Sequence, residues 1–187
     1  MTALLRFDGV ACVRGGRTLF EGLDLALEPG EALLVTGPNG CGKSSLLRLA
    51  AGLLQPAAGK AARGDAALAD DSLALDREVS LSQALKFWSS LDGSAPGRAM
   101  DAMGLTALAD VPVRSLSTGQ ARRARLARVI ASGAALWLLD EPANGLDREG
   151  LARLDTAIAD HRSAGGAVLA ASHSALAGEW RTLDLAR

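Results

Sequence analysis

The chain has 187 residues, 49% of them hydrophobic and 22% charged, which predicts one globular domain with its own core. The net charge of -1 and the pI near 6.1 argue against a surface that generally attracts nucleic acid. We see no secretion signal, no apolar stretch long enough to span a bilayer, and no metal or redox motif around Cys12 and Cys41, so we expect a protein of the reducing cytosol.

The first predicted elements form a strand, a loop and a helix. Residues 23–28 alternate as in a half-buried strand, and residues 32–36 are a short apolar run typical of a strand covered on both faces. A Gly-rich segment follows, and residues 45–54 carry apolar side chains at helical spacing. This order predicts the start of an α/β fold.

The rest of the chain alternates between helices and strands. Residues 55–80 show weak periodicity and are assigned no element, whereas 81–92 and 98–109 are predicted helices. Buried strands are predicted at 135–140 and 167–172, with a helix at 149–163 between them. We therefore expect a single α/β domain over 1–187 with a mostly parallel sheet and a helical subdomain at roughly 70–128.

A phosphate-binding loop is predicted between the strand at 32–36 and the following helix. Residues 37–44 match the pattern G-x-x-x-x-G-K-S/T in full. Glycines let backbone N–H groups converge on phosphate oxygens, and the helix N-terminus adds its dipole. Lys43 is expected to reach the β- and γ-phosphates, and Ser44 to hold Mg²⁺. The candidate nucleotide-binding residues here are Gly37, Pro38, Asn39, Gly40, Cys41, Gly42, Lys43, Ser44 and Ser45.

Two acids follow the strand at 135–140. Asp140 stands where a phosphate-binding loop requires a metal-orienting carboxylate at the tip of a neighbouring strand. Glu141 comes directly after it and is the candidate general base for the attacking water. ATP and Mg²⁺ are thus the expected substrate and cofactor.

The segment LSTGQARRARLAR at 116–128 has two interpretations. Its arginines could form a basic face for nucleic acid, or LSTGQ could open a helix whose free N–H groups face a phosphate. Given the phosphate-binding loop upstream, we favour the second interpretation. We interpret the arginines as the solvated and partner-facing sides of that helix. Arg122, Arg125 and Arg128 share one face, which we expect to form salt bridges or to dock on a partner rather than to bind DNA.

The motifs together resemble those of the ATP-binding-cassette (ABC) ATPases, a family of P-loop NTPases. GPNGCGKS, LSTGQ, LWLLDEP, NGLD and a histidine after the last apolar strand occur in that family's order. The resemblance implies a parallel core sheet, a small antiparallel β part and a short helical insertion. It also implies a dimer of two cassettes around two ATP molecules, in which Ser117, Gly119 and Gln120 contact the nucleotide of the partner. Asp147 would link the cassettes, and His173 would sense the γ-phosphate.

Two positions depart from the family pattern. The family's adenine-stacking aromatic residue aligns near Arg14, whose guanidinium can also stack on a planar base. The family's coupling glutamine is missing, and Asp70 or Asp71 would replace it.

Four stretches narrow the resemblance: RFDGVACVRGGRTLFEGLDLALEPGEALLVTGPNGCGKSSLLRLAAGL, LKFW, LSTGQARRARLARV and LWLLDEP. In these stretches the chain resembles the small ATP-binding subunits of bacterial haem exporters of cytochrome c maturation. That resemblance implies a peripheral protein at the cytoplasmic face of the inner membrane, docked on small integral membrane subunits and binding neither nucleic acid nor haem. His161, the other histidine, lies on a predicted polar, solvent-exposed helix face. An ATPase of another exporter and a soluble cassette for iron–sulfur assembly remain open; a nucleic-acid cassette would need a coiled-coil insertion or a second cassette.

Overall fold

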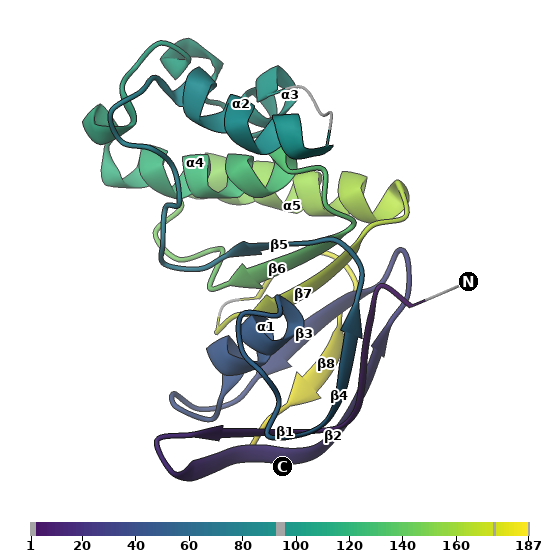
Figure 1. Cartoon of the computed structure of the whole chain (residues 1–187). Helices are drawn as coiled ribbons and strands as arrows, with labels where there is room; N and C mark the ends of the chain where they lie inside the picture. The colour runs from purple at the N-terminus through teal and green to yellow at the C-terminus, as the bar shows by residue number, and fades with distance from the viewer. Residues whose placement is uncertain (1–2, 93–95, 174, 187) are drawn as a thin grey trace.

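The computed structural model describes residues 3–92, 96–173 and 175–186. Its central layer is a five-stranded sheet in the order β5-β6-β7-β3-β8, with every pair parallel (Figure 1). The strands are β3 (Ala32–Thr36), β5 (Ala66–Ala69), β6 (Leu136–Asp140), β7 (Ala167–Ala171) and β8 (Arg181–Asp184). Parallel strands place their carboxyl ends at one edge, where α/β proteins bind ligands.

A second, antiparallel sheet has the order β2-β1-β4. It consists of β1 (Leu5–Arg14), β2 (Arg17–Leu27) and β4 (Ala58–Arg63). The long hairpin of β1 and β2 lies below α1 in the orientation of Figure 1.

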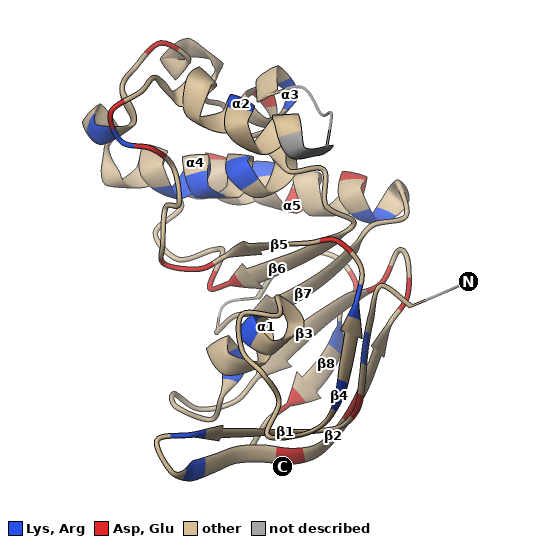
Figure 2. Ribbon diagram, in the orientation of Figure 1, with Lys and Arg blue, Asp and Glu red and all other residues tan. Residues whose placement is uncertain are grey.

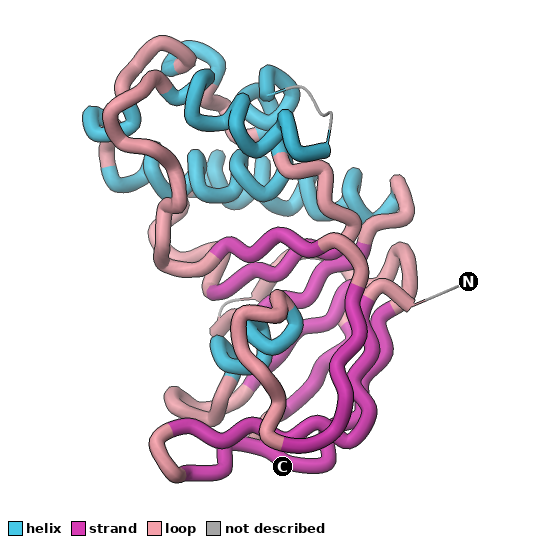
Figure 3. Tube along the Cα trace, in the orientation of Figure 1, coloured by secondary structure: helices cyan, strands magenta, loops and turns pink. Residues whose placement is uncertain are grey.

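Helices cover both faces of the parallel sheet (Figure 3). The helix α1 (Lys43–Ala50) packs on one face, and α4 (Thr118–Ala131) and α5 (Arg148–Ser163) pack on the other. The helices α2 (Leu81–Asp92) and α3 (Pro96–Ala102) lie outside α4, and short 3₁₀ turns span Thr106–Leu108 and Val113–Ser115. Along β6, Leu136 and Leu138 join the core beneath α1, while Trp137 and Leu139 join the core beneath α4 and α5. A strand buried on both faces explains its continuous apolar sequence.

The expected α/β fold of the P-loop NTPase type is confirmed, and most predicted elements occur close to their expected bounds. The unassigned residues 55–80 contain β4 and β5. The predicted helix at 98–109 is wrong in extent, since α3 ends at Ala102. Gly104 follows with a φ of +63° and no room for a Cβ, which would lie 2.7 Å from Arg153 Nε. This left-handed turn ends the helix. No helix in the described ranges has the length and apolarity that a membrane crossing requires.

The arginines of α4, which follow one another along the helix in Figure 2, do not all face solvent or a partner. Arg125 and Arg128 are buried, and they donate to the backbone carbonyls of Asp70 and Leu68. The strand β5 is the edge of the parallel sheet, so alternate carbonyls lack a strand partner and need other donors. The interpretation of Arg125 and Arg128 as solvated was therefore wrong. Burial lowers the pKa of both guanidinium groups, which still stay protonated at neutral pH.

The expected exposure of His161 was also wrong. Its ring stacks on Trp137, with centroids 3.9 Å apart and planes 9° from parallel, and its Nε2 lies 3.1 Å from the carbonyl oxygen of Ala135. Gly166 makes room for the ring, because a Cβ there would lie 2.2 Å from it. Burial lowers the pKa of His161, so a neutral ring is favoured.

Candidate nucleotide site

The candidate phosphate-binding loop follows β3 at the carboxyl edge of the sheet and ends in α1. Gly42 is the N-cap of α1, and no side chain caps the helix, so its first N–H groups remain available to an anion. The φ of Gly42 is +114°, and a Cβ there would lie 3.2 Å from Leu19 and 3.1 Å from Phe20. The left-handed conformation favours glycine at this position, and a side chain there would also crowd Leu19 and Phe20.

Lys43, near the end of the loop, is held by hydrogen bonds to the beginning of the loop. Lys43 is buried as a residue, and its ammonium donates to the carbonyls of Gly37 at 2.8 Å and Pro38 at 3.3 Å. An ammonium has three donors, so one is left for a phosphate oxygen beyond these two bonds. Cys41 packs against the start of the loop, since a Cβ on Gly37 would lie 2.8 Å from its sulfur.

Glu141 has a strained backbone at the end of β6. Its φ is +47°, a left-handed value that a residue with a side chain rarely adopts. Its backbone N–H donates to the carbonyl of Ala171 at 2.8 Å, which fixes the residue against the end of β7. Strain of this kind persists where the surroundings enforce it, often at functional sites.

A hydrogen-bond network links the loop, β6 and β7. His173 lies two residues beyond β7; its backbone N–H donates to Glu141 Oε2 at 3.3 Å, and its Nε2 lies 3.4 Å from Glu141 Oε1. The same Nε2 lies 3.0 Å from Asn39 Oδ1. Both neighbours of Nε2 are oxygen atoms, so a proton on Nε2 would be donated to them. The network orients the Glu141 carboxylate toward the loop.

These residues line one cavity of about 350 Å³. Its wall includes Lys43, Asp140, Glu141 and His173, and the full lining consists of Arg14, Leu19, Asn39, Gly40, Gly42, Lys43, Ser44, Ser45, Asp140, Glu141 and His173. The structure thus brings together the loop, the two acids and the histidine that the sequence singled out. Leu19 was missed, because an apolar residue in a hairpin carries no chemical signature.

The signature residues Ser117, Gly119 and Gln120 do not line this cavity. They open α4, where Ser117 Oγ accepts from the Gln120 N–H at 3.3 Å and Gln120 Oε1 accepts from the Ser117 N–H at 2.8 Å. This reciprocal capping box fixes the helix start. These signature residues lie away from the loop of their own chain. A site that is completed by a second chain requires this separation.

Asp147 is the N-cap of α5, and its Oδ1 accepts from the Gly150 N–H at 2.7 Å. The turn before it is tied to the signature helix, because Arg122 Nη1 donates to the Gly145 carbonyl at 3.2 Å. The starts of α4 and α5 are thus held together, although neither lines the cavity.

Asp70 and Asp71 directly follow β5, the strand that pairs with β6. Asp70 accepts from the Ser72 N–H and lies 3.9 Å from Arg48 of α1, and Asp71 lies 3.8 Å from Arg125 of α4. Neither lines the cavity. These acids connect the end of β5 to helices on both faces of the sheet.

Oxygen donors suited to Mg²⁺ are present in the cavity. The Ser44 hydroxyl and the Asp140 carboxylate both line it, and hydroxyl, carboxylate and phosphate oxygens are the ligands that Mg²⁺ prefers. The described residues contain no cluster of three or more His, Cys, Asp or Glu side chains suited to a metal ion. A Mg²⁺ ion bound chiefly by a nucleotide needs no such cluster.

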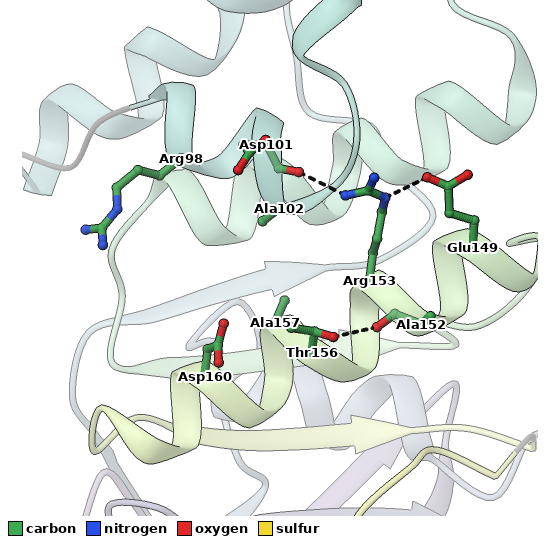
Figure 4. A pocket seen from close by; sticks show the side chains of 9 residues that line it. All are labelled: Arg98, Asp101, Ala102, Glu149, Ala152, Arg153, Thr156, Ala157 and Asp160. Carbon is green, nitrogen blue, oxygen red and sulfur yellow. Dashed lines mark hydrogen bonds and ion pairs between the residues drawn. The ribbon is translucent and has the colours of Figure 1, made fainter.

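Another cavity, of about 610 Å³, lies away from the loop, between α3 and α5 (Figure 4). Arg153 of α5 donates to Glu149 on the same helix at 2.9 Å, and it donates to the Asp101 carbonyl of α3 at 3.1 Å. None of its lining residues is a predicted site residue. We interpret its charged groups as contacts that hold α3 against α5.

Comparisons with known proteins agree with this geometry. The family model described as ABC transporter matches residues 20–144. Two relatives are each named cytochrome c biogenesis ATP-binding export protein CcmA. The protein of Sphingopyxis alaskensis is 64% identical over 95% of this chain and 93% of its own, and that of Zymomonas mobilis is 51% identical over 98% and 85%.

A solved structure has the same fold. It is described as a metal-chelate type ABC transporter in an inward-facing conformation. It superposes with a TM-score of 0.82 at 27% identity, covering 100% of this chain and 82% of its own.

Proposed function

The chain belongs to the ABC transporter family, and on that premise we propose that it is the ATP-hydrolysing subunit of a transporter complex that powers haem export and haem-chaperone release in c-type cytochrome biogenesis. The observation that carries the ATPase assignment is the convergence of Lys43, Asp140, Glu141 and His173 on one cavity. The names of the relatives support the cytochrome c assignment.

ATP binding rests on the loop and the start of α1. Residues Gly37, Pro38, Asn39, Gly40, Cys41 and Gly42 supply the backbone that surrounds the phosphates, and Ser44 and Ser45 continue it into the helix. Lys43 neutralises phosphate charge with the donor that its two carbonyl contacts leave over.

Ser44 and Asp140 would hold Mg²⁺. When bound, the ion supplies charge neutralisation between the phosphate oxygens. Asp140, at the carboxyl end of β6, would act through that ion, while Glu141 would face the water.

Glu141 would accept the proton of the attacking water. A bond forms between the water oxygen and the γ-phosphorus, the bond to the bridging oxygen breaks, and ADP leaves with the electron pair. His173 and Asn39 keep the carboxylate in position through the network described above. Since His173 bridges Glu141 and the loop, it is suited to sense whether a γ-phosphate is present.

The second half of the site would come from another copy of the chain. Ser117, Gly119 and Gln120 would approach the γ-phosphate of the partner, because the N-terminus of α4 presents N–H groups and a positive dipole. Asp147 would link the two copies near the same helix. We expect ATP to complete this interface and to drive dimerisation.

Small integral membrane subunits are the further proposed partners, which would hold the chain peripherally at the cytoplasmic face of the inner membrane. Leu53 and Phe87 are 69% and 62% exposed. Leu53 and Trp88 line a cavity of about 570 Å³, and Phe87 contacts Trp88 edge to face at 5.4 Å. Exposed apolar side chains around a hollow are the surface that a partner segment would cover.

A complementation experiment tests the proposed function. In a bacterium lacking its own ATP-binding export protein of cytochrome c biogenesis, this chain should restore covalent haem in c-type cytochromes, and its Glu141→Gln variant should not. A chain that hydrolyses ATP but fails to restore haem attachment, and that purifies without membrane proteins, would support a soluble cassette instead. Purification with other membrane proteins would support a different exporter.

A further inference from the structure

One side chain of α4 connects the start of that helix to the turn that precedes α5. Arg122, in the second turn of α4, donates from Nη1 to the Gly145 carbonyl at 3.2 Å. Gly145 has a left-handed φ of +66°, and the Arg122 guanidinium occupies the space that a Cβ on Gly145 would need. The contact therefore depends on both residues, and a side chain at position 145 would displace the guanidinium.

The turn that Arg122 contacts runs from Glu141, the candidate base, to Asp147, the N-cap of α5. Within the turn, the Asn144 N–H donates to the Glu141 carbonyl at 3.1 Å. Arg122 and Gly145 are both exposed, so water competes for their hydrogen bond. The contact consequently adds little to the stability of one chain, whereas its geometry is specific. These features favour a role in association with a second chain over a role in the core.

Both segments that Arg122 joins are the ones that would meet the partner copy, with Ser117 at the start of α4 and Asp147 at the start of α5. We propose that Arg122 is a positioning residue, which fixes the two helix starts relative to each other so that a second copy meets one preformed surface. The inference rests on the proposed ATP-driven dimer. Ordering both segments before association lowers the entropic cost of association. Because Arg122 does not line the cavity of its own chain, ATP binding by the monomer does not depend on it.

The competing explanation is that the charge of Arg122 acts directly on the phosphates bound by the partner. A double-mutant cycle between Arg122→Ala and Gly145→Ala separates the two explanations. Gly145→Ala keeps the charge of Arg122 but removes the space that its guanidinium occupies. If Arg122 acts through Gly145, the double variant associates no more weakly than the weaker single variant. If Arg122 acts through its charge alone, the losses of the two single variants multiply.

Arg123→Ala is the matched control. Arg123 adjoins Arg122 on α4, and its Nη1 also donates to backbone carbonyls, those of Met103 at 3.2 Å and Gly104 at 3.4 Å. Gly104 has a left-handed φ of +63°, as Gly145 has a left-handed φ in the other contact. The control thus removes the same charge and the same kind of contact from the same helix. Its contact leads to the segment after α3 instead of the turn before α5.

The experiment measures the monomer–dimer Kd by sedimentation with Mg²⁺ and a non-hydrolysable ATP analogue. It also measures the Kd for ATP by calorimetry at protein concentrations at which the chain is monomeric. One net hydrogen bond gives about two- to ten-fold in an equilibrium constant, and a symmetric dimer contains the contact twice. We therefore expect Arg122→Ala to weaken dimerisation by about four- to one-hundred-fold relative to Arg123→Ala, with the same Kd for ATP.

Gly145→Ala should weaken dimerisation at least as much as Arg122→Ala, because alanine is also strained at a φ of +66°. The double variant should lie within about two-fold of Gly145→Ala. Three results would overturn the inference: dimerisation of Arg122→Ala equal to that of Arg123→Ala, multiplied losses in the double variant, or an equal loss of ATP binding and dimerisation in Arg122→Ala. Failure of the unmodified chain to bind ATP or to dimerise would instead refute the proposed function itself.

Discussion

Replacing Ser117 with Asp separates the structural role of this residue from its proposed role across the dimer. In the structure Ser117 caps α4, accepting from the Gln120 N–H at 3.3 Å. Aspartate is an N-cap about as good as serine, and its charge suits the positive end of a helix. We therefore expect the free energy of unfolding of Ser117→Asp to change by less than about 1 kcal/mol.

The same change should be severe for ATP-driven dimerisation. In a completed site, Ser117 would lie against the γ-phosphate bound by the partner. Two unit negative charges about 4 Å apart repel by about 4 kcal/mol at an effective dielectric constant of about 20. This repulsion corresponds to roughly a thousand-fold weaker association for each site. ATP binding to the monomer should persist, because Ser117 does not line the cavity of its own chain.

The assay is analytical ultracentrifugation with a non-hydrolysable ATP analogue, alongside urea unfolding. Ser80→Asp is the matched control, because Ser80 and Gln83 form an equivalent pair at the start of α2, with N–H to oxygen distances of 3.2 and 3.4 Å. Ser80→Asp adds the same negative charge to the same kind of helix cap, but at a position away from the cavity. A Ser117→Asp protein that dimerises at the same analogue concentration as Ser80→Asp would refute the trans role of Ser117.

Three further predictions concern the site and the core. Lys43→Ala should weaken ATP binding by about ten- to one-hundred-fold through loss of a charge-assisted hydrogen bond, measured by calorimetry, and unchanged binding would refute the loop assignment. Asp140→Asn should raise the Mg²⁺ concentration needed for half-maximal turnover, whereas an unaltered Mg²⁺ titration would exclude Asp140 as a ligand of the ion. Because burial lowers the pKa of His161, the unfolded chain takes up its proton first as pH falls. Stability should therefore decrease below pH of about 6.5, by up to about 1.4 kcal/mol per unit, and this part of the decrease should disappear in His161→Phe, measured by urea unfolding at several pH values.

The convergence of the candidate nucleotide-site residues on one cavity could be predicted because their sequence signals are local. The glycines, the lysine and the serine of the loop at 37–44 occur at one fixed spacing. The strand and the helix that flank the loop are adjacent to it in the sequence. The sequence could not assign β5, whose residues AALA have no strand propensity and form a strand only by pairing with β6. Because β5 was not predicted, the role of Arg125 and Arg128 was not predicted either. These two side chains donate to carbonyl groups at the end of β5 and beyond it.

Long-range packing accounts for the other differences. The polar helix pattern around His161 gave no sign that Gly166 opens a space for the ring against Trp137. The position of Arg14 in the lining of the cavity was anticipated through the family resemblance alone, since no local pattern places β1 beside the loop. The relation between Ser117 and the nucleotide is untested by a single chain and stays a proposal.

We propose Glu141 as the base of an ATPase whose active form is an ATP-bound dimer. The most direct measurement is the turnover and the sedimentation of Glu141→Gln with ATP and Mg²⁺. We predict that phosphate release falls by at least about a hundred-fold, because a carboxamide cannot accept the proton, while ATP accumulates in a stable dimer. Normal turnover in Glu141→Gln would contradict the role of Glu141 as base, and an ATP-saturated protein that remains monomeric would contradict the ATP-bound dimer.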